Sequence, residues 1–231
     1  MKQIIKRGSF LTLIFKLLGR LSLYAADNDL ITKQITIKLE KAGTLLDRIG
    51  SRKKNKITNL KIIGEINGTD LSMIRKMAGS TDGKLSVLDL SEAKIVEVWD
   101  CYYNDVICDG AFGGCSGLTS LNLPAGITKI GSYAFEGCSG LTSLNLPAGI
   151  TSIGDKAFRG CSGLTSLNLP AGITSIDNDA FNGCSGLTSL NLPAGITSIG
   201  NDAFNGCSGL TSLNLPAGIT KIGYGAFLGC I

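Results

Sequence analysis

The segment CSGLTSLNLPAGIT, residues 115–128, recurs without change at residues 138–151, 161–174, 184–197 and 207–220. Successive copies start 23 residues apart. A catalytic site needs one asymmetric arrangement of chemical groups, whereas an identical repeat supplies the same groups many times. The repetition therefore points to a repeating architecture rather than to an enzyme.

The first half of each copy has the pattern of a short strand that ends in a turn. Leu118, Leu121 and Leu123 follow the spacing L-x-x-L-x-L, in which a strand turns alternate side chains to one side. Pro124 ends this strand, because proline has no backbone N–H to donate to a neighbouring strand. All five prolines of the chain occupy this one position of the repeat.

The second half of each copy supplies further apolar side chains. Ile127 and Ile130 predict a second extended piece, and Ala134 and Phe135 bring a large ring toward the centre of the unit. One unit of 23 residues cannot bury these side chains by itself. Stacked units can, because each side chain then packs on its counterpart in the next coil. The sequence therefore predicts a solenoid with coils about 4.8 Å apart, the spacing of parallel strands.

The repeat resembles the leucine-rich repeat of the BspA-like family, whose units follow approximately the pattern C-x-x-L-x-x-L-x-L-P-x-x-I-x-x-I-x-x-x-A-F. All five copies fit this pattern. The resemblance implies a leucine-rich repeat solenoid, with one parallel β-sheet of stacked coils and a convex side that is mostly non-helical. It also implies an exported or surface-displayed protein that binds other proteins.

The region before the repeats resembles the divergent capping segment with which chains of this family often begin. The matching segments are TIKLEKAGTLLDRIG, ITNLKIIGEINGTDLSMIRKMAG and LSVLDLSEAKI. Alternating apolar residues at 35–39 predict a half-buried strand. Thr69 or Asp70 is expected to cap a helix that ends at Gly79.

These patterns divide the chain into three parts. Residues 1–26 are predicted to be a signal peptide, and residues 27–114 an irregular N-terminal α/β cap with divergent repeats. Residues 115–231 are predicted to hold five 23-residue leucine-rich repeats, incomplete at the C-terminus.

The signal-peptide prediction rests on a basic start, an apolar run FLTLIF and a small-residue exit LYAAD. Lys16 and Arg20 interrupt the apolar part, so an amphipathic arm that is not removed is the alternative. No uncharged apolar run approaches the roughly 20 residues that a membrane-spanning helix needs. No cysteine lies near the exit to carry a lipid anchor. The predicted location is secreted or at the cell surface.

Composition excludes several classes of function. The chain has no histidine, which removes His-based catalytic triads, general bases and metal ligands. Five of its 22 basic residues lie in residues 1–26, which leaves 17 basic against 18 acidic residues in the remainder. A near-neutral body has no electrostatic signature of nucleic-acid binding. We expect no catalytic residue, cofactor or resident metal.

The cysteines fall into two groups. Six occupy the same repeat position, 23 residues apart, which is too far for a metal-binding pair and predicts buried, unpaired thiols. Cys101 and Cys108 lie instead in EVWDCYYNDVICDGAF, within a ten-residue insertion in the coil before the repeats. A disulfide between these two cysteines is one hypothesis.

The same insertion is a candidate binding loop because it holds three large aromatic residues, Trp99, Tyr102 and Tyr103. Plain packing of the cap is the alternative. A calcium site is a further alternative, although the spacing of an EF-hand is absent. Its oxygen ligands would come from Asp100, Asn104, Asp105 and Asp109.

The main candidate binding face is the outer side of the repeat strands, where leucine-rich repeat proteins usually bind their partners. Its positions are neutral, small and able to hydrogen-bond, so a solvated sheet without a ligand is an equally good interpretation. The predicted residues are Ser120, Asn122, Ser143, Asn145, Ser166, Asn168, Ser189, Asn191, Ser212 and Asn214.

Together these features predict a non-catalytic exported or cell-surface protein that mediates protein–protein interaction or adhesion to host or neighbouring cells. The alternative is a structural spacer without a specific ligand, and a hydrolase built in the cap is a third, less favoured hypothesis. The partner would be an unidentified host extracellular or bacterial surface protein. The apolar residues of the last coil, such as Leu213 and Phe227, have no following coil to cover them. We therefore expect either a longer repeat array or self-association through this coil.

Overall fold

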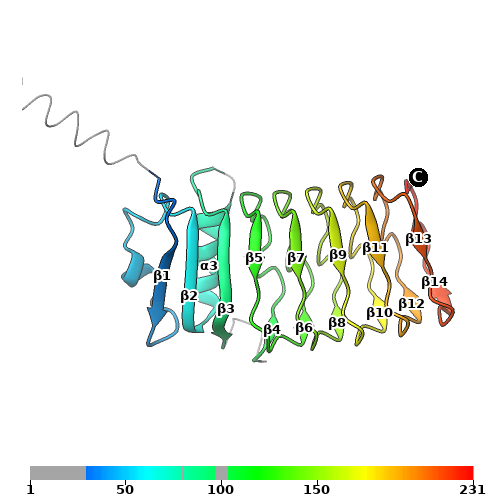
Figure 1. The fold of residues 1–231 in the computed structure, drawn as a ribbon, viewed down its shortest axis with the longest axis horizontal. Helices are drawn as coiled ribbons and strands as arrows, with labels where there is room; N and C mark the ends of the chain where they lie inside the picture. Colours follow the sequence, from blue (N-terminus) through cyan, green and yellow to red (C-terminus); the bar gives the residue numbers. More distant parts are fainter. Residues whose placement is uncertain (1–29, 80, 97–103, 231) are drawn as a thin grey trace, which may run out of the picture.

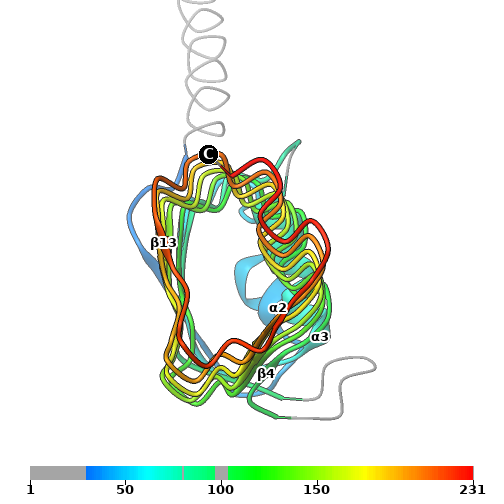
Figure 2. The same cartoon turned by 90° about the vertical axis from the view of Figure 1, so that its right-hand side faces the viewer.

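Residues 30–79, 81–96 and 104–230 are described by a computed structural model, in which they form an elongated stack of coils (Figure 1). Eight strands form one sheet in the order β1-β2-β3-β5-β7-β9-β11-β13, and each pair of neighbours is parallel. Viewed along the stack, this sheet forms one side of every coil, and the turns and helices lie on the other (Figure 2). The predicted leucine-rich repeat solenoid is confirmed.

The strands of the sheet are long in the N-terminal region and short in the repeats. The first three are β1 (Ile35–Leu39), β2 (Asn59–Ile66) and β3 (Val87–Ile95). The repeats contribute β5 (Ser120–Asn122), β7 (Ser143–Asn145), β9 (Ser166–Asn168), β11 (Ser189–Asn191) and β13 (Leu213–Asn214). The repeat strands are short because the sequence Leu-Pro follows each asparagine and ends the ladder.

The second extended piece of each repeat is also present. Two smaller parallel sheets form from β4 (Val106–Ile107), β6 (Lys129–Ile130) and β8 (Ser152–Ile153), and from β10 (Ser175–Ile176), β12 (Ser198–Ile199) and β14 (Lys221–Ile222). Within them, equivalent isoleucines pair in register, as Ile130 does with Ile153.

Two helices belong to the N-terminal region, α2 (Leu45–Ile49) and α3 (Gly68–Ala78). The expected cap of α3 at Thr69 or Asp70 is wrong, because the side chain of Asn67 accepts the N–H groups of both residues. Asp70 completes a capping box by accepting the N–H of Asn67. Gly79 follows the last helical residue, as expected. The sequence pattern did not reveal α2, which has only five residues.

Asp70 also joins the two helices. Its side chain is buried, and its carboxylate accepts the N–H of Gly43 at 2.6 Å, of Leu45 at 3.0 Å and of Asn67 at 3.1 Å. Three backbone donors balance the cost of burying this carboxylate. One acidic side chain thus fixes the start of α3 against the start of α2.

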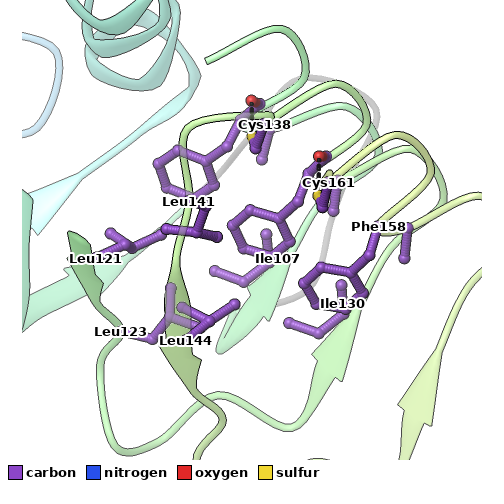
Figure 3. Close-up of a cluster of buried hydrophobic side chains, with 14 of the residues drawn as sticks. Ile107, Leu121, Leu123, Ile130, Cys138, Leu141, Leu144, Phe158 and Cys161 are labelled. Atoms are coloured by element: carbon purple, nitrogen blue, oxygen red, sulfur yellow. Dashed lines mark hydrogen bonds between the residues drawn. The ribbon is translucent and has the colours of Figure 1, made fainter. Parts of the chain in front are cut away.

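A column of phenylalanine rings runs through the centre of the stack. Adjacent rings lie 5.1–5.5 Å apart between centroids and within 9° of parallel. Leucine and isoleucine side chains of the same coils surround the rings (Figure 3). The predicted internal column is therefore present. It consists of Phe112, Phe135, Phe158, Phe181, Phe204 and Phe227.

A ladder of thiols runs beside the rings. The six repeat cysteines are free, and all but Cys230 are buried. The Sγ of Cys138 donates to the carbonyl oxygen of Phe112 at 3.1 Å, and Cys161 donates to Phe135 in the same way (Figure 3). Burial raises the pKa of Cys161 to about 12. Cys138 and Cys161 therefore connect neighbouring coils, and the buried thiol of Cys161 is a poor nucleophile.

Candidate binding face

The exposed side of the repeat strands carries two parallel rows of polar side chains. In each three-residue strand of β5, β7, β9 and β11 the serine and the asparagine are exposed and the leucine between them is buried. The strands pair in register, so Ser120 lies beside Ser143 and Asn122 beside Asn145. We call these the serine row and the asparagine row. All ten residues proposed from the sequence lie on this face (Ser120, Asn122, Ser143, Asn145, Ser166, Asn168, Ser189, Asn191, Ser212 and Asn214).

The side-chain amides of the asparagine row have no hydrogen-bond partner among the described residues. This holds for Asn122, Asn145 and their equivalents. The threonine that precedes each serine of the serine row behaves differently. Thr142 donates its hydroxyl to the carbonyl of Thr119, and Thr165 donates to Thr142, at 3.3 and 3.2 Å. The threonines thus join coils, whereas the asparagines face solvent unpaired.

The asparagine row continues onto the N-terminal strands, where it becomes charged. Asp89 pairs in register with Asn122, Lys61 with Asp89, and Thr36 with Lys61. The sequence prediction did not include these residues. The signal was available, because the leucine spacing of residues 85–90 places Asp89 at the position of Asn122.

Lys61 is the centre of a small ion cluster on this end of the face. Its Nζ lies 2.6 Å from Glu92 and 3.4 Å from Asp89. The hydrogen bond to Glu92 raises the pKa of Lys61. Partial burial would raise the pKa of Asp89, but hydrogen bonds from Ser91 and the charge of Lys61 outweigh it and lower that pKa. The face therefore has a charged end at β2 and β3 and a neutral amide end in the repeats.

The candidate cap loop lies mostly outside the described residues, including Trp99, Cys101, Tyr102 and Tyr103. Cys108 is disulfide-bonded, and the six repeat cysteines are free. Because Cys101 is not described, its pairing with Cys108 stays a prediction.

Two of the oxygen ligands suggested for calcium make other contacts. The carboxylate of Asp109 accepts the N–H of Ser132 at 2.8 Å, and the carbonyl of Asp105 accepts the N–H of Thr128. Asp100 lies outside the described residues. Over residues 30–79, 81–96 and 104–230, no group of three or more acidic or thiol side chains is placed to hold a metal ion.

Several apolar side chains of the last coil are exposed, while Leu213 and Phe227, named from the sequence as uncovered, are partly buried. Leu215 is 45% exposed, Ile222 48% and Leu228 63%. Beside them, a hollow of about 260 Å³ is lined partly by Leu213 and Phe227. Self-association through this coil stays a prediction.

The parallel sheet, the in-register leucines and the central ring column define a leucine-rich repeat protein with an exposed polar face. Residues 105–231 match the family model of the BspA type leucine-rich repeat region in six copies. The chain belongs to this family, which the repeat pattern had suggested. Leucine-rich repeat families are generally non-enzymatic scaffolds, and BspA-type proteins are typically surface or secreted proteins.

Solved structures of two bacterial leucine-rich repeat proteins are similar to this chain. One is a protein of T. pallidum, 21% identical with a TM-score of 0.54, and the match covers 86% of this chain and 77% of that protein. The other is from Bacteroides ovatus, also 21% identical with a TM-score of 0.54, with 82% and 53% covered. This chain thus spans about half of the B. ovatus protein. Both likenesses concern the fold.

No curated protein matches the chain. Neither helix in the described parts of the chain is long and apolar enough to cross a lipid bilayer.

Proposed function

We propose that this protein is an exported or cell-surface scaffold that binds a protein partner through the serine and asparagine rows. The observation that carries the proposal is the set of unpaired, exposed amides held at regular spacing on a rigid parallel sheet. Each amide offers both a donor and an acceptor, and the sheet holds the row in place before the partner binds. The protein has no catalytic role in this proposal.

The neutral end of the face favours a partner that is also uncharged where it meets the repeats. Binding there should depend only weakly on salt, because screening acts on charges. Adhesion to host or neighbouring cells is the biological role that fits a surface-displayed member of this family. A spacer without a ligand is the competing function, since a solvated sheet would look the same.

The experiment compares capture of purified host extracellular proteins by the wild-type chain and by two triple variants. Asn145→Ala, Asn168→Ala and Asn191→Ala together remove three adjacent amides from the face. Ser139→Ala, Ser162→Ala and Ser185→Ala are the matched control, because these serines are exposed in the turn before each strand. Binding that is lost only in the asparagine variant supports the proposal. Capture that is equal in all three proteins would mean that the partner binds another surface, which contradicts the proposal. No capture by any of them favours the spacer.

A further inference from the structure

The repeats differ from one another mainly in the turn that surrounds each Ala-Phe pair. This turn lies on the side of the coil opposite the large sheet (Figure 2). We call this surface the loop face. Its central row consists of the residue before each alanine, namely Gly110, Tyr133, Lys156, Asp179, Asp202 and Gly225.

Backbone hydrogen bonds hold the central row straight. The N–H of Tyr133 donates to the carbonyl of Asp155 in the next coil, and Lys156 donates to Asn178 in the same way, both at 2.9 Å. All six members of the row have a positive φ, between 52° and 63°. Because the backbone conformations are alike, the Cα–Cβ bonds of the non-glycine residues in the row point in the same direction.

The backbone conformation does not explain the residues at two of these positions, although the Nζ of Lys156 also donates to the hydroxyl of Tyr133 at 3.4 Å. A positive φ suits glycine and, next best, aspartate or asparagine. Gly110, Asp179 and Asp202 follow that preference, whereas Tyr133 and Lys156 do not. Residues held in an unfavourable backbone conformation often serve a function. Tyr133 remains 41% exposed although the Nζ of Lys156 lies 5.2 Å from its ring centre.

The charges of the central row are separated along the stack. Tyr133 and Lys156 occupy its N-terminal half, and Asp179 and Asp202 occupy its C-terminal half. The amide of Asn182 donates to Asp179 at 2.7 Å, and Asn205 donates to Asp202 at 2.8 Å. These bonds fix both carboxylates in place.

The central row is complementary to a second copy of itself that faces it and runs in the opposite direction. Reversal sets Lys156 against Asp179, Tyr133 against Asp202 and Gly110 against Gly225. We propose that the loop face binds the loop face of a second copy of this chain in the antiparallel direction. The two-fold axis lies between the two surfaces, at right angles to the stack, between the coils of Lys156 and Asp179.

Two-fold symmetry makes each polar contact occur twice in the dimer. Lys156 of each copy forms an ion pair with Asp179 of the other, and the Tyr133 hydroxyl donates to Asp202. A parallel dimer would instead set Lys156 against Lys156 and Asp179 against Asp179. Like charges in direct opposition oppose association, so the antiparallel direction is favoured.

The rows on either side of the central row are compatible with the same reversal. The residues two before each alanine then pair Asp155 with Asn178, and the residues after each phenylalanine pair Arg159 with Asn182. In these two rows no like charges meet. The first row is Asp109, Ser132, Asp155, Asn178, Asn201 and Tyr224, and the second is Gly113, Glu136, Arg159, Asn182, Asn205 and Leu228.

The size of the surface predicts a weak dimer. The ring spacing of 5.1–5.5 Å makes the six coils only about 26 Å long. Interfaces of this extent belong to the small, transient class. The dimer would turn the two large sheets outward on opposite sides. If the asparagine rows bind a partner, the dimer is therefore bivalent.

The test is sedimentation equilibrium of the full chain from about 1 µM to 1 mM at low salt. The variants are Lys156→Asp and Asp179→Lys, and the chain itself carries aspartate and lysine at equivalent positions of the row. In a dimer of either variant alone, both contacts between positions 156 and 179 bring two like charges together. Each variant should therefore weaken its own dimer at least about tenfold. When the two variants are mixed one to one, they should form a mixed dimer. One chain then has a carboxylate at both positions 156 and 179 and the other has an ammonium group at both, so each contact is an ion pair. Lys38→Asp on the exposed sheet is the control and should leave the dimer unchanged.

A wild-type chain that stays monomeric over this range overturns the proposal. Self-association that neither variant changes also overturns the proposal, because contact through the last coil does not involve these charges. Weakening by each variant with recovery in the mixture establishes the antiparallel pairing.

Discussion

Truncation of one ring in the central column measures how far the stacked core stabilises the protein. Phe181 is fully buried, and its ring centroid lies 5.3 Å from those of both Phe158 and Phe204. Replacing a buried phenylalanine with alanine costs about 3–5 kcal/mol, since burial is lost and a cavity remains. Two stacked contacts disappear as well, so we expect Phe181→Ala to lie at the upper end of that range.

The assay is urea unfolding followed by far-ultraviolet circular dichroism, with the free energy of unfolding taken from the midpoint and slope. The slope of the variant must match that of the wild type, because long repeat arrays can lose cooperativity. Phe227→Ala is the matched control. Phe227 is only partly buried and has one ring neighbour in the column, at 5.5 Å, so its truncation should cost clearly less.

Either of two results would refute this reasoning. A loss below about 1 kcal/mol for Phe181→Ala would mean that the ring does not behave as core. An equal loss for Phe181→Ala and Phe227→Ala would mean that stability does not depend on the depth of a ring in the stack.

Three further predictions concern the thiols, the helix junction and the ion cluster. Alkylation of the folded protein at neutral pH should label the partly exposed Cys230 before Cys161, whose pKa burial raises to about 12, and mass spectrometry showing early labelling of Cys161 would contradict this. Asp70→Ala leaves three backbone N–H groups without an acceptor and should cost about 3 kcal/mol in thermal unfolding, against about 1 kcal/mol for Asn67→Ala. The pKa of Asp89 lies below its ordinary value of 3.8, so the stability it contributes is present above that value and lost as the pH falls through the lowered pKa. Asp89→Asn should therefore flatten the acid side of the stability–pH curve, and an unchanged curve would show that the cluster does not contribute.

Most of the candidate face could be predicted from the repeat. Alternation along a strand is a local property, so the buried Leu121 between exposed Ser120 and Asn122 follows from the spacing of the leucines. Phe135 recurs at a fixed interval, and identical coils stacked in register bring identical rings together. The period of 23 residues thus determined the fold, the core and the direction of the polar rows.

Tertiary structure decided which polar groups are free. Thr142 and Asn145 are both exposed polar residues of the same coil, and the sequence does not distinguish them. Only the position of the preceding coil gives the threonine hydroxyl an acceptor, the carbonyl of Thr119, and leaves the asparagine amide without one. The same limit explains the error at the α3 cap, where Asn67, Thr69 and Asp70 are all suitable capping residues. The choice among them depends on where each side chain lies relative to the first backbone N–H groups of the helix, and Asp70 is held there partly by donors from 25 and 27 residues earlier in the chain.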